Sequence, residues 1–410
     1  MATKHTSAPA LLDKTTVSAS RHVSHAVTSN RTPYVKQRER VEQSPESRAR
    51  RKHRFRLVER MRHFTTRERQ KVCLCTPIPT AQPEIRGNSK TKSSHFSKLM
   101  RCGYATTCPN CSVKVLNRHA VDIHSAVQQS LENGYGIGFL TFTTRHALSD
   151  SAKSLITLLK GAFKAVLSGR GWQNDRADFG ILGVIKSWDC TFSWVNGWHI
   201  HLHVLVFFDE HLPRGKEQRR LDQVMDRMWN RFYAYHEKEG DRLPEVYNQR
   251  AVVVDRAGGL GKYMAKLSGI SQEMARSDFK KGKRHDGAMT FTHWEILQLA
   301  CELDGEDAEP YKALWRDWEE AIYRTQVVSW SKGFKKHFGI ANLSDEEIAA
   351  EEEAYDWVHV LTNEEWALIK DSADRKSMAL SYAATDGVEG LRGYLHHLRK
   401  KKVKSTSDAL

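Results

Sequence analysis

Three histidines at alternating positions are the residues best suited to chemistry in this sequence. His199, His201 and His203 lie in the segment Asn196-Gly-Trp-His-Ile-His-Leu-His-Val-Leu-Val-Phe-Phe208. Successive side chains of a β-strand point to opposite faces, so the three imidazoles would share one face. Three polar rings are poor core material, but imidazole binds divalent cations well. The pattern therefore predicts a metal site with open positions, which would polarise a phosphate and orient it for attack.

A carboxylate from the preceding strand would complete this ligand set. Asp189 lies in Lys186-Ser-Trp-Asp-Cys-Thr191, and hairpin pairing of the two strands would place it beside the histidines. Histidines combined with a carboxylate suit Mg²⁺ or Mn²⁺ at a phosphoryl-transfer site, and zinc is an alternative. We expect His201 and His203 as ligands, with either His199 or Asp189 as the third.

A tyrosine and a lysine downstream form a second candidate constellation. Tyr263 and Lys266 follow a glycine-rich turn in Gly258-Gly-Leu-Gly-Lys-Tyr-Met-Ala-Lys-Leu267. On a helix they would lie on the same face. A phenol needs a neighbouring cation or a polarised electrophile to act as a nucleophile at neutral pH. Lys266 would supply that charge or steady a phosphate, although such a pair alone is usually an ordinary helix surface.

Clustered cysteines near residue 100 predict a structural zinc site. Cys108 and Cys111 form a C-P-x-C knuckle, and two thiolates at this spacing can bind one tetrahedral Zn²⁺. Cys102 is the expected third ligand and Cys75 the preferred fourth. Other candidates for the fourth position are Cys73, His119 and His95. Seven cysteines at uneven spacing favour a metal site in a reducing compartment over a disulfide framework.

The elements that would position these residues alternate between strands and helices. Strands are expected at 136–144, 180–188, 199–208 and 251–254, and helices at 119–131, 151–167, 219–236 and from about 261. This order indicates an α+β fold with a split βαβ antiparallel sheet and helices on one face. We divide the chain into a basic, disordered arm (1–72), a cysteine-rich zinc-binding segment (73–118), a catalytic domain (119–270) and a mostly helical C-terminal region (271–410).

Charge points to a polyanionic partner. The chain carries a formal net charge of +15 and has a pI of about 9.4, and residues 1–72 hold eighteen Lys and Arg against six Asp and Glu. Such a segment can bind DNA by displacing counterions from phosphates. The residues expected to do so are Arg50, Arg51, Lys52, Arg54 and Arg56. No apolar run approaches the roughly 18 residues that cross a bilayer, and no secretory signal is recognised, so a cytoplasmic protein without a membrane partner is expected.

The histidine strand followed by the tyrosine helix resembles the HUH endonuclease superfamily, and most closely its single-tyrosine initiators of plasmid rolling-circle replication. Members commonly carry a Gly-Trp-His-Pro-His-x-His-Val-Leu segment, which resembles residues 197–205 except that Ile200 replaces proline. Their first motif, a strand ending in Thr-x-Thr, is similar to residues 139–144. Asp189 stands where a glutamate is usual, and Gly259 where some members have a glutamate that helps the terminating cleavage. The resemblance covers roughly residues 100–270.

The resemblance implies a nicking reaction. A divalent cation on His201 and His203 would hold the scissile phosphate, and Tyr263 would become joined to its 5′ phosphate. The freed 3′ hydroxyl would prime a host polymerase. The implied partners are single-stranded or supercoiled origin DNA, a host helicase and a DNA polymerase.

Two alternatives remain open at this point. A transposase or relaxase would use the same core, although relaxases more often place the tyrosine before the histidine strand. A non-catalytic, zinc-containing DNA-binding regulator would explain the charge and the cysteines, but would leave the histidines and Tyr263 without a role.

Overall fold

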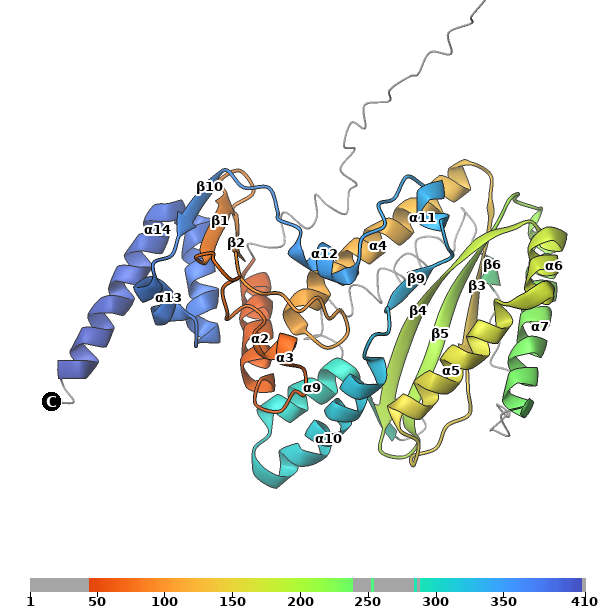
Figure 1. The fold of residues 1–410 in the computed structure, drawn as a ribbon, viewed down its shortest axis with the longest axis horizontal. Helices are drawn as coiled ribbons and strands as arrows, with labels where there is room; N and C mark the ends of the chain where they lie inside the picture. The colour runs from red at the N-terminus through yellow and green to blue at the C-terminus, as the bar shows by residue number, and fades with distance from the viewer. Residues whose placement is uncertain (1–43, 239–251, 254–283, 286–287, 408–410) are drawn as a thin grey trace, which may run out of the picture.

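The computed structural model describes residues 44–238, 252–253, 284–285 and 288–407. The described chain belongs to the α+β class, with helices packed against two antiparallel sheets (Figure 1). This confirms the predicted class and the antiparallel pairing. Tyr263 and Lys266, and the helix expected to carry them, lie outside the described residues.

The larger sheet carries the histidine strand at its centre. Its spatial order is β6-β3-β5-β4-β8-β7, with β9 also paired to β4, and every pairing is antiparallel. The strands are β3 (Gly136–Thr143), β4 (Ile181–Ser193), β5 (Gly197–Phe208), β6 (Val252–Val253), β7 (Arg284–His285), β8 (Ala288–Thr292) and β9 (Val328–Trp330).

Three helices cover one face of this sheet: α5 (Ala152–Val166), α6 (Gly169–Phe179) and α7 (Arg214–Lys238) (Figure 1). Phe142 of β3 contacts Phe163 of α5 and Phe232 of α7, with ring centroids 5.3 and 5.5 Å away. A Cβ on Gly138 would lie 2.2 Å from Leu221 Cδ1, so glycine lets α7 approach β3 closely. The even-numbered residues of β5 face these helices and fill the core, which leaves the odd-numbered histidines on the opposite face.

Among the described elements, helices cover the histidine face toward one end of β5. Phe207 packs against Phe334 and Phe338, which lie in and just after α11 (Phe334–His337). Two further helices lie near α11 in Figure 1, α4 (Pro109–Glu132) and α12 (Asp345–Ala350). The other end of the strand, with His199, His201 and His203, lies beyond α11, so these side chains do not enter the packed core at Phe207.

A smaller sheet of β10 (Trp357–Val360), β1 (Glu84–Asn88) and β2 (Ser93–Ser97) joins segments from both ends of the described chain. Around it lie α2 (Pro45–Met61), α3 (Glu68–Lys71), α13 (Asn363–Ile369) and α14 (Ala373–Ser407). The remaining helices, α9 (His293–Glu302) and α10 (Gly305–Ile322), lie between the two sheets in Figure 1. Trp198 at the start of β5 stacks on Trp318 of α10 and donates its indole N–H to Asp317 (2.8 Å).

The expectation about the N-terminal arm needs correction. Residues 45–72, expected to be disordered, contain α2 and α3, because Phe55, Leu57, Val58 and Met61 bury one side of α2. The described part of the C-terminal region is mostly helical, as expected, and it also contributes β8 and β9, which pair with β4 of the larger sheet.

Within the region expected to be catalytic, the described elements match the predicted ones to within about five residues, except that α4 begins ten residues earlier than expected and α6 was not predicted. None of the described helices is both long and apolar enough to cross a membrane.

Candidate functional site

The strand register brings a polar strip together on the open face of the larger sheet. In β4, Asp189 pairs with His201 and Ser187 pairs with His203. In β3, on the other side of β5, Thr143 pairs with His201 and Thr141 with His203. Directly paired residues of adjacent strands point to the same face. The histidines are therefore flanked by a carboxylate and a hydroxyl on one side and by two hydroxyls on the other.

Three of these side chains are close enough to share a metal ion. Ligand atoms of Asp189, His201 and His203 all lie within 4.8 Å of one another. The Asp189 Oδ2 atom lies 3.2 Å from His201 Nε2 and 3.6 Å from His203 Nε2. Two imidazoles and one carboxylate form a ligand set that can bind a divalent cation. The predicted pairing of Asp189 with the histidine strand is thus present, and Asp189 is the third member of the group that could hold a metal ion.

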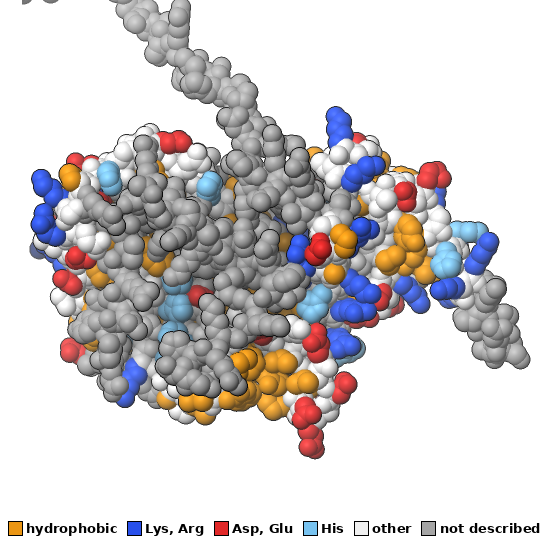
Figure 2. Space-filling model, turned by 180° about the vertical axis from the view of Figure 1, so that it is seen from behind, with side chains coloured by type: hydrophobic (Ala, Val, Ile, Leu, Met, Phe, Trp, Pro, Cys, Tyr) orange, Lys and Arg blue, Asp and Glu red, His pale blue; other side chains and the backbone are white. Residues whose placement is uncertain are grey.

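The site is accessible from one side. The Asp189 side chain is 34% exposed, whereas His203 is 6% exposed. Figure 2 shows histidine side chains beside acidic ones on this face of the molecule. A cation held here would keep open coordination positions toward solvent, as a catalytic site requires.

Hydrogen bonding keeps the Asp189 carboxyl ionised. Partial burial opposes its ionisation, but hydrogen bonds from His201 and His203 hold its pKa well below the usual range. The carboxylate therefore retains its negative charge at neutral pH and can act as a ligand.

Neighbouring groups orient His203. The Thr141 hydroxyl lies 3.2 Å from His203 Nδ1, and the Phe139 ring stacks on the imidazole at 5.1 Å. A partner on Nδ1 fixes the ring and leaves Nε2 directed at Asp189 and the candidate metal position. His199 is placed differently: its side chain is exposed, its ring lies beside His146 (4.9 Å), and it does not belong to the three-residue group.

The cysteines form a second candidate metal site, and it is fully buried. Sulfur atoms of Cys73, Cys102, Cys108 and Cys111 lie within 4.8 Å of one another. The shortest separations are 3.6 Å for Cys73–Cys111 and 3.7 Å for Cys102–Cys111 and Cys108–Cys73. Four thiolates at about 2.3 Å from a tetrahedral zinc would be about 3.8 Å apart, whereas a disulfide needs about 2.05 Å. The spacing fits a four-cysteine metal site and not a disulfide.

The surrounding backbone explains why these four sulfurs converge. Leu74 and Gly103, each next to a ligand, adopt left-handed conformations with φ of 53° and 74°. The Leu74 amide donates to the Met100 carbonyl (2.9 Å) and the Met100 amide donates to the Thr76 carbonyl (2.8 Å), and these bonds hold the two ligand-bearing segments side by side. Cys108 is the N-cap of α4 and Cys111 lies in its first turn, where the helix dipole favours a thiolate. Hydrogen bonds from the other three thiols lower the pKa of Cys111 well below its usual value.

The fourth cysteine ligand was assigned to Cys75, and the structure places Cys73 there instead. The Cys75 sulfur contacts the Lys71 carbonyl (3.4 Å) and the Thr76 hydroxyl (3.6 Å), outside the cluster. In a Cys-Leu-Cys sequence the left-handed Leu74 sends the two thiols apart, so only one can reach Cys111. The other candidates are also displaced: His119 Nε2 contacts Asp345 (2.8 Å), and His95 lies on β2 outside the group.

The basic residues expected to contact DNA lie on α2, and several already contact α14. Arg51 donates to Ser381 Oγ (2.8 Å), and Arg56 forms a bidentate ion pair with Asp374 (2.9 Å for each bond). Lys52 also contacts Asp374 (3.0 Å). Arg50 and Arg54 lie on the same helix, half buried. These cations help to hold α14 in place, so any contact with DNA would add to a structural role.

Two curated Streptomyces proteins are similar in sequence to this chain. The chain is 23% identical to "Protein rep" of Streptomyces lividans over 296 residues, which are 59% of this chain and 64% of that protein. It is 28% identical to "Neomycin resistance protein" of Streptomyces cyanogenus over 132 residues, 26% of this chain and 30% of that protein. The chain thus spans less than two thirds of the length of these relatives. No family model and no solved structure matches.

The similarity to a Rep protein confirms the resemblance to such proteins that the motifs indicated. The sequence motifs did not reveal the role of Thr141 beside His203 or the choice of Cys73. The alternation of Phe139, Thr141 and Thr143 could have pointed to the first, because it matches the period of the histidines.

Proposed function

We propose that this chain is a DNA nickase that starts rolling-circle replication of a plasmid. The observation that carries the proposal is the group of Asp189, His201 and His203, held on paired strands with one side open to solvent. A row of histidines without a carboxylate would not form such a ligand set. A non-catalytic regulator would have no need of this ligand set.

The arrangement of the chain supports assignment of this region to an HUH nuclease fold. The chain order β3, α5, α6, β4, β5, α7, β6 is a βαββαβ sequence, with an extra helix in the first crossover, and its four strands lie in the order β6-β3-β5-β4. This is the ferredoxin-like, split βαβ connectivity, with the helices on one face. The similarity to "Protein rep" of Streptomyces lividans supports a role in replication.

Each residue then has a role. Asp189, His201 and His203 would hold Mg²⁺ or Mn²⁺, and a cation there would polarise the scissile phosphate. Thr141 would keep His203 oriented toward it. The Tyr263 oxygen would form a bond to the phosphorus while the bond to the 3′ oxygen breaks, and the phenol proton would pass to that oxygen. Lys266 would stabilise the added negative charge. The four cysteines would hold a structural zinc away from the chemistry.

The test is strand cleavage of origin DNA. Supercoiled plasmid carrying the replication origin found next to the gene is incubated with the purified full chain and Mn²⁺ or Mg²⁺. We expect conversion to the open-circular form, dependent on the cation and on the origin sequence. Binding without any conversion would favour the regulator alternative. Cleavage confined to the ends of a mobile element would favour the transposase.

A further inference from the structure

Two hollows on the described surface share part of their walls, and together they are called the groove below. The first is a cavity of about 360 Å³ between the Cys102–Cys108 loop, the end of α10 and the start of α12. The second, of about 670 Å³, lies along β9 and α11. They share Gln326, Ser344 and Asp345 in their walls, so one extended ligand could occupy both.

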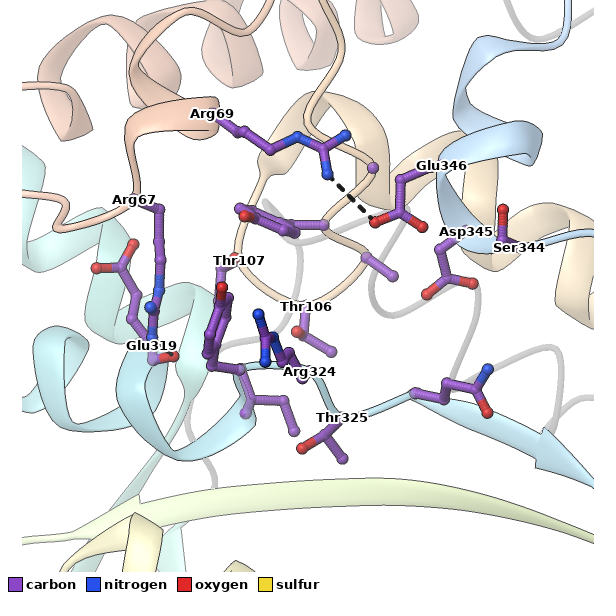
Figure 3. A pocket seen from close by; sticks show the side chains of 16 residues that line it. Arg67, Arg69, Thr106, Thr107, Glu319, Arg324, Thr325, Ser344, Asp345 and Glu346 are labelled. Atoms are coloured by element: carbon purple, nitrogen blue, oxygen red, sulfur yellow. Dashed lines mark hydrogen bonds and ion pairs between the residues drawn. The ribbon is translucent and has the colours of Figure 1, made fainter.

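The first hollow combines cations with aromatic faces. Figure 3 shows Arg67, Arg69 and Arg324 reaching it from α3 and from the segment after α10. The guanidinium carbon of Arg67 lies 3.9 Å from the centre of the Tyr323 ring, and that of Arg324 lies 5.2 Å from it. Tyr323 is 42% exposed although nearby apolar side chains are buried. Because Arg67 already lies over the Tyr323 ring, a base would stack on the part of the ring that stays exposed, and the arginines beside it offer a phosphate its counter-charge.

The second hollow carries exposed positive charges. Lys332 and Lys336 line it with exposed side chains, and Trp330 adds another aromatic ring. Within the described part of the chain, Arg324, Lys332 and Lys336 form no ion pair. Lys335 is buried and pairs with Asp122 (3.4 Å), so it belongs to the structure beneath the groove.

The acidic groups in the walls are already engaged. Glu319 is buried and accepts a hydrogen bond from Thr65 (2.5 Å), Asp345 contacts His119 (2.8 Å), and Glu346 pairs with Arg69 (3.5 Å). The arginines and acidic residues of the first hollow balance in number, and the excess of positive charge lies in the second hollow, where Lys332, Lys335 and Lys336 stand against Asp345. Such an excess of positive charge attracts a chain of phosphates.

The groove runs close to the candidate metal site. Gln326 lines both hollows, and the next residue, Val327, accepts a hydrogen bond from the Trp188 amide (3.1 Å), which adjoins Asp189. A path of one Cα step from Gln326 to Val327, the hydrogen bond to Trp188 and one Cα step to Asp189 is on the order of 10 Å. A single strand cleaved at the metal site would need to extend only a few nucleotides to enter the groove.

We propose that this groove binds single-stranded DNA flanking the scissile phosphate, with Tyr323 stacking on a base and Arg324 and Lys332 contacting phosphates. The proposal rests on the proposed nicking function for the meaning of the bound strand, but binding itself requires neither the cation nor cleavage. Aromatic platforms in a positive groove are a general means of holding single strands.

The test measures binding of a fluorescent oligo(dT) 15-mer to the full chain by anisotropy, in EDTA and at several salt concentrations. The groove variant carries Arg324→Glu and Lys332→Glu. The matched control carries Lys216→Glu and Arg219→Glu, which make the same charge change at exposed positions on α7, on the opposite side of the sheet. We expect at least tenfold weaker binding by the groove variant and about twofold or less by the control. The slope of log affinity against log salt should fall by about 1.4 for two lost phosphate contacts.

Tyr323→Leu tests stacking without altering charge. It should weaken oligo(dT) binding about fivefold or more and leave the salt slope unchanged. Equal losses in the groove variant and the α7 control would overturn the proposal, as would unchanged binding by Tyr323→Leu. Displacement of the 15-mer by equimolar dTMP would show that the groove binds a mononucleotide. Displacement by an acidic peptide of equal charge would show that it binds a protein segment. Either result contradicts the proposal. If the groove variant loses binding and the wild type does not nick DNA, the assignment of the groove would stand and the nickase function would be rejected.

Discussion

At the residue scale, the register between β4 and β5 decides which side chains can share a cation. Asp189 lies opposite His201, and its Oδ2 atom reaches both His201 and His203. A shift of one residue would turn Asp189 to the helix-covered face, where a carboxylate would be buried among apolar side chains. The buried alternation of Ile200, Leu202 and Val204 fixes that register.

Replacing both His201 and His203 with alanine should abolish nicking and leave DNA affinity within about threefold of the wild type. The reason is that affinity comes from phosphate neutralisation by Lys and Arg, whereas the chemistry depends on the cation. Cleavage is followed on labelled origin DNA, and affinity by anisotropy on the same strand. Normal cleavage by the double variant at saturating Mn²⁺ would exclude the metal site.

Asp189→Asn and His199→Ala form a matched pair for the third ligand. Asparagine keeps the shape of Asp189 but removes its charge, so we expect nicking to fall by about two orders of magnitude. His199 lies outside the cluster, so His199→Ala should change the rate by less than about tenfold. Half-saturating Mn²⁺ concentrations are measured for both variants. The reverse order of effects would assign the third position to His199.

The histidine strand could be predicted because a period of two is visible in the sequence itself. The third ligand could not, since it depends on which residues of β4 and β5 stand opposite each other. Cys73 and Cys75 differ for a similar reason: the left-handed backbone at Leu74 selects between them, and leucine carries no preference for that conformation.

At the element scale, the cysteine cluster ties a loop segment to the start of α4. Cys73 comes before β1, Cys102 after β2, and Cys108 and Cys111 from α4 itself. A cation bound by the four buried sulfurs would hold these segments together, so it would contribute to the local stability.

Cys73→Ser should therefore lower zinc content from about one equivalent per chain to near zero, whereas Cys75→Ser should retain it. Zinc is measured by elemental analysis of protein purified under reducing conditions, and release is followed with a colorimetric chelator during thiol titration. We also expect a lower thermal midpoint for the first variant and not for the second. Zinc loss in Cys75→Ser alone would restore Cys75 as the ligand.

Helix α2 shows the limit of prediction at this scale. Its apolar residues, including Phe55 and Leu57, are separated by arginines and look like part of a solvated tail. They are buried because α14, more than 300 residues later, provides Asp374, Ser377 and Ser381 as partners for the basic side chains. No local sequence pattern predicts a partner so distant in sequence.

At the scale of the whole molecule, segments that are far apart in the sequence pack together in both sheets. Segments from before β3 and after β8 complete the smaller sheet, and β9 joins the larger one beside Ser187. This explains how α3, the cysteine loop and α12 come to line one groove close to Asp189. In Figure 1 the two sheets lie apart, with α9 and α10 between them. A strand of DNA could thus contact both parts while its phosphate is held at the larger sheet.

Tyr263 is proposed to attack a phosphate held at Asp189, His201 and His203. Full-length chain is incubated with single-stranded origin DNA and Mn²⁺, and the protein is digested and mapped by mass spectrometry. We predict an adduct to the 5′ side of the cut on the peptide containing Gly261-Lys-Tyr-Met-Ala-Lys266. It should be absent in Tyr263→Phe, which removes only the hydroxyl, and should form more slowly in Lys266→Ala. An adduct on Tyr247, or one undiminished in Tyr263→Phe, would contradict the assignment.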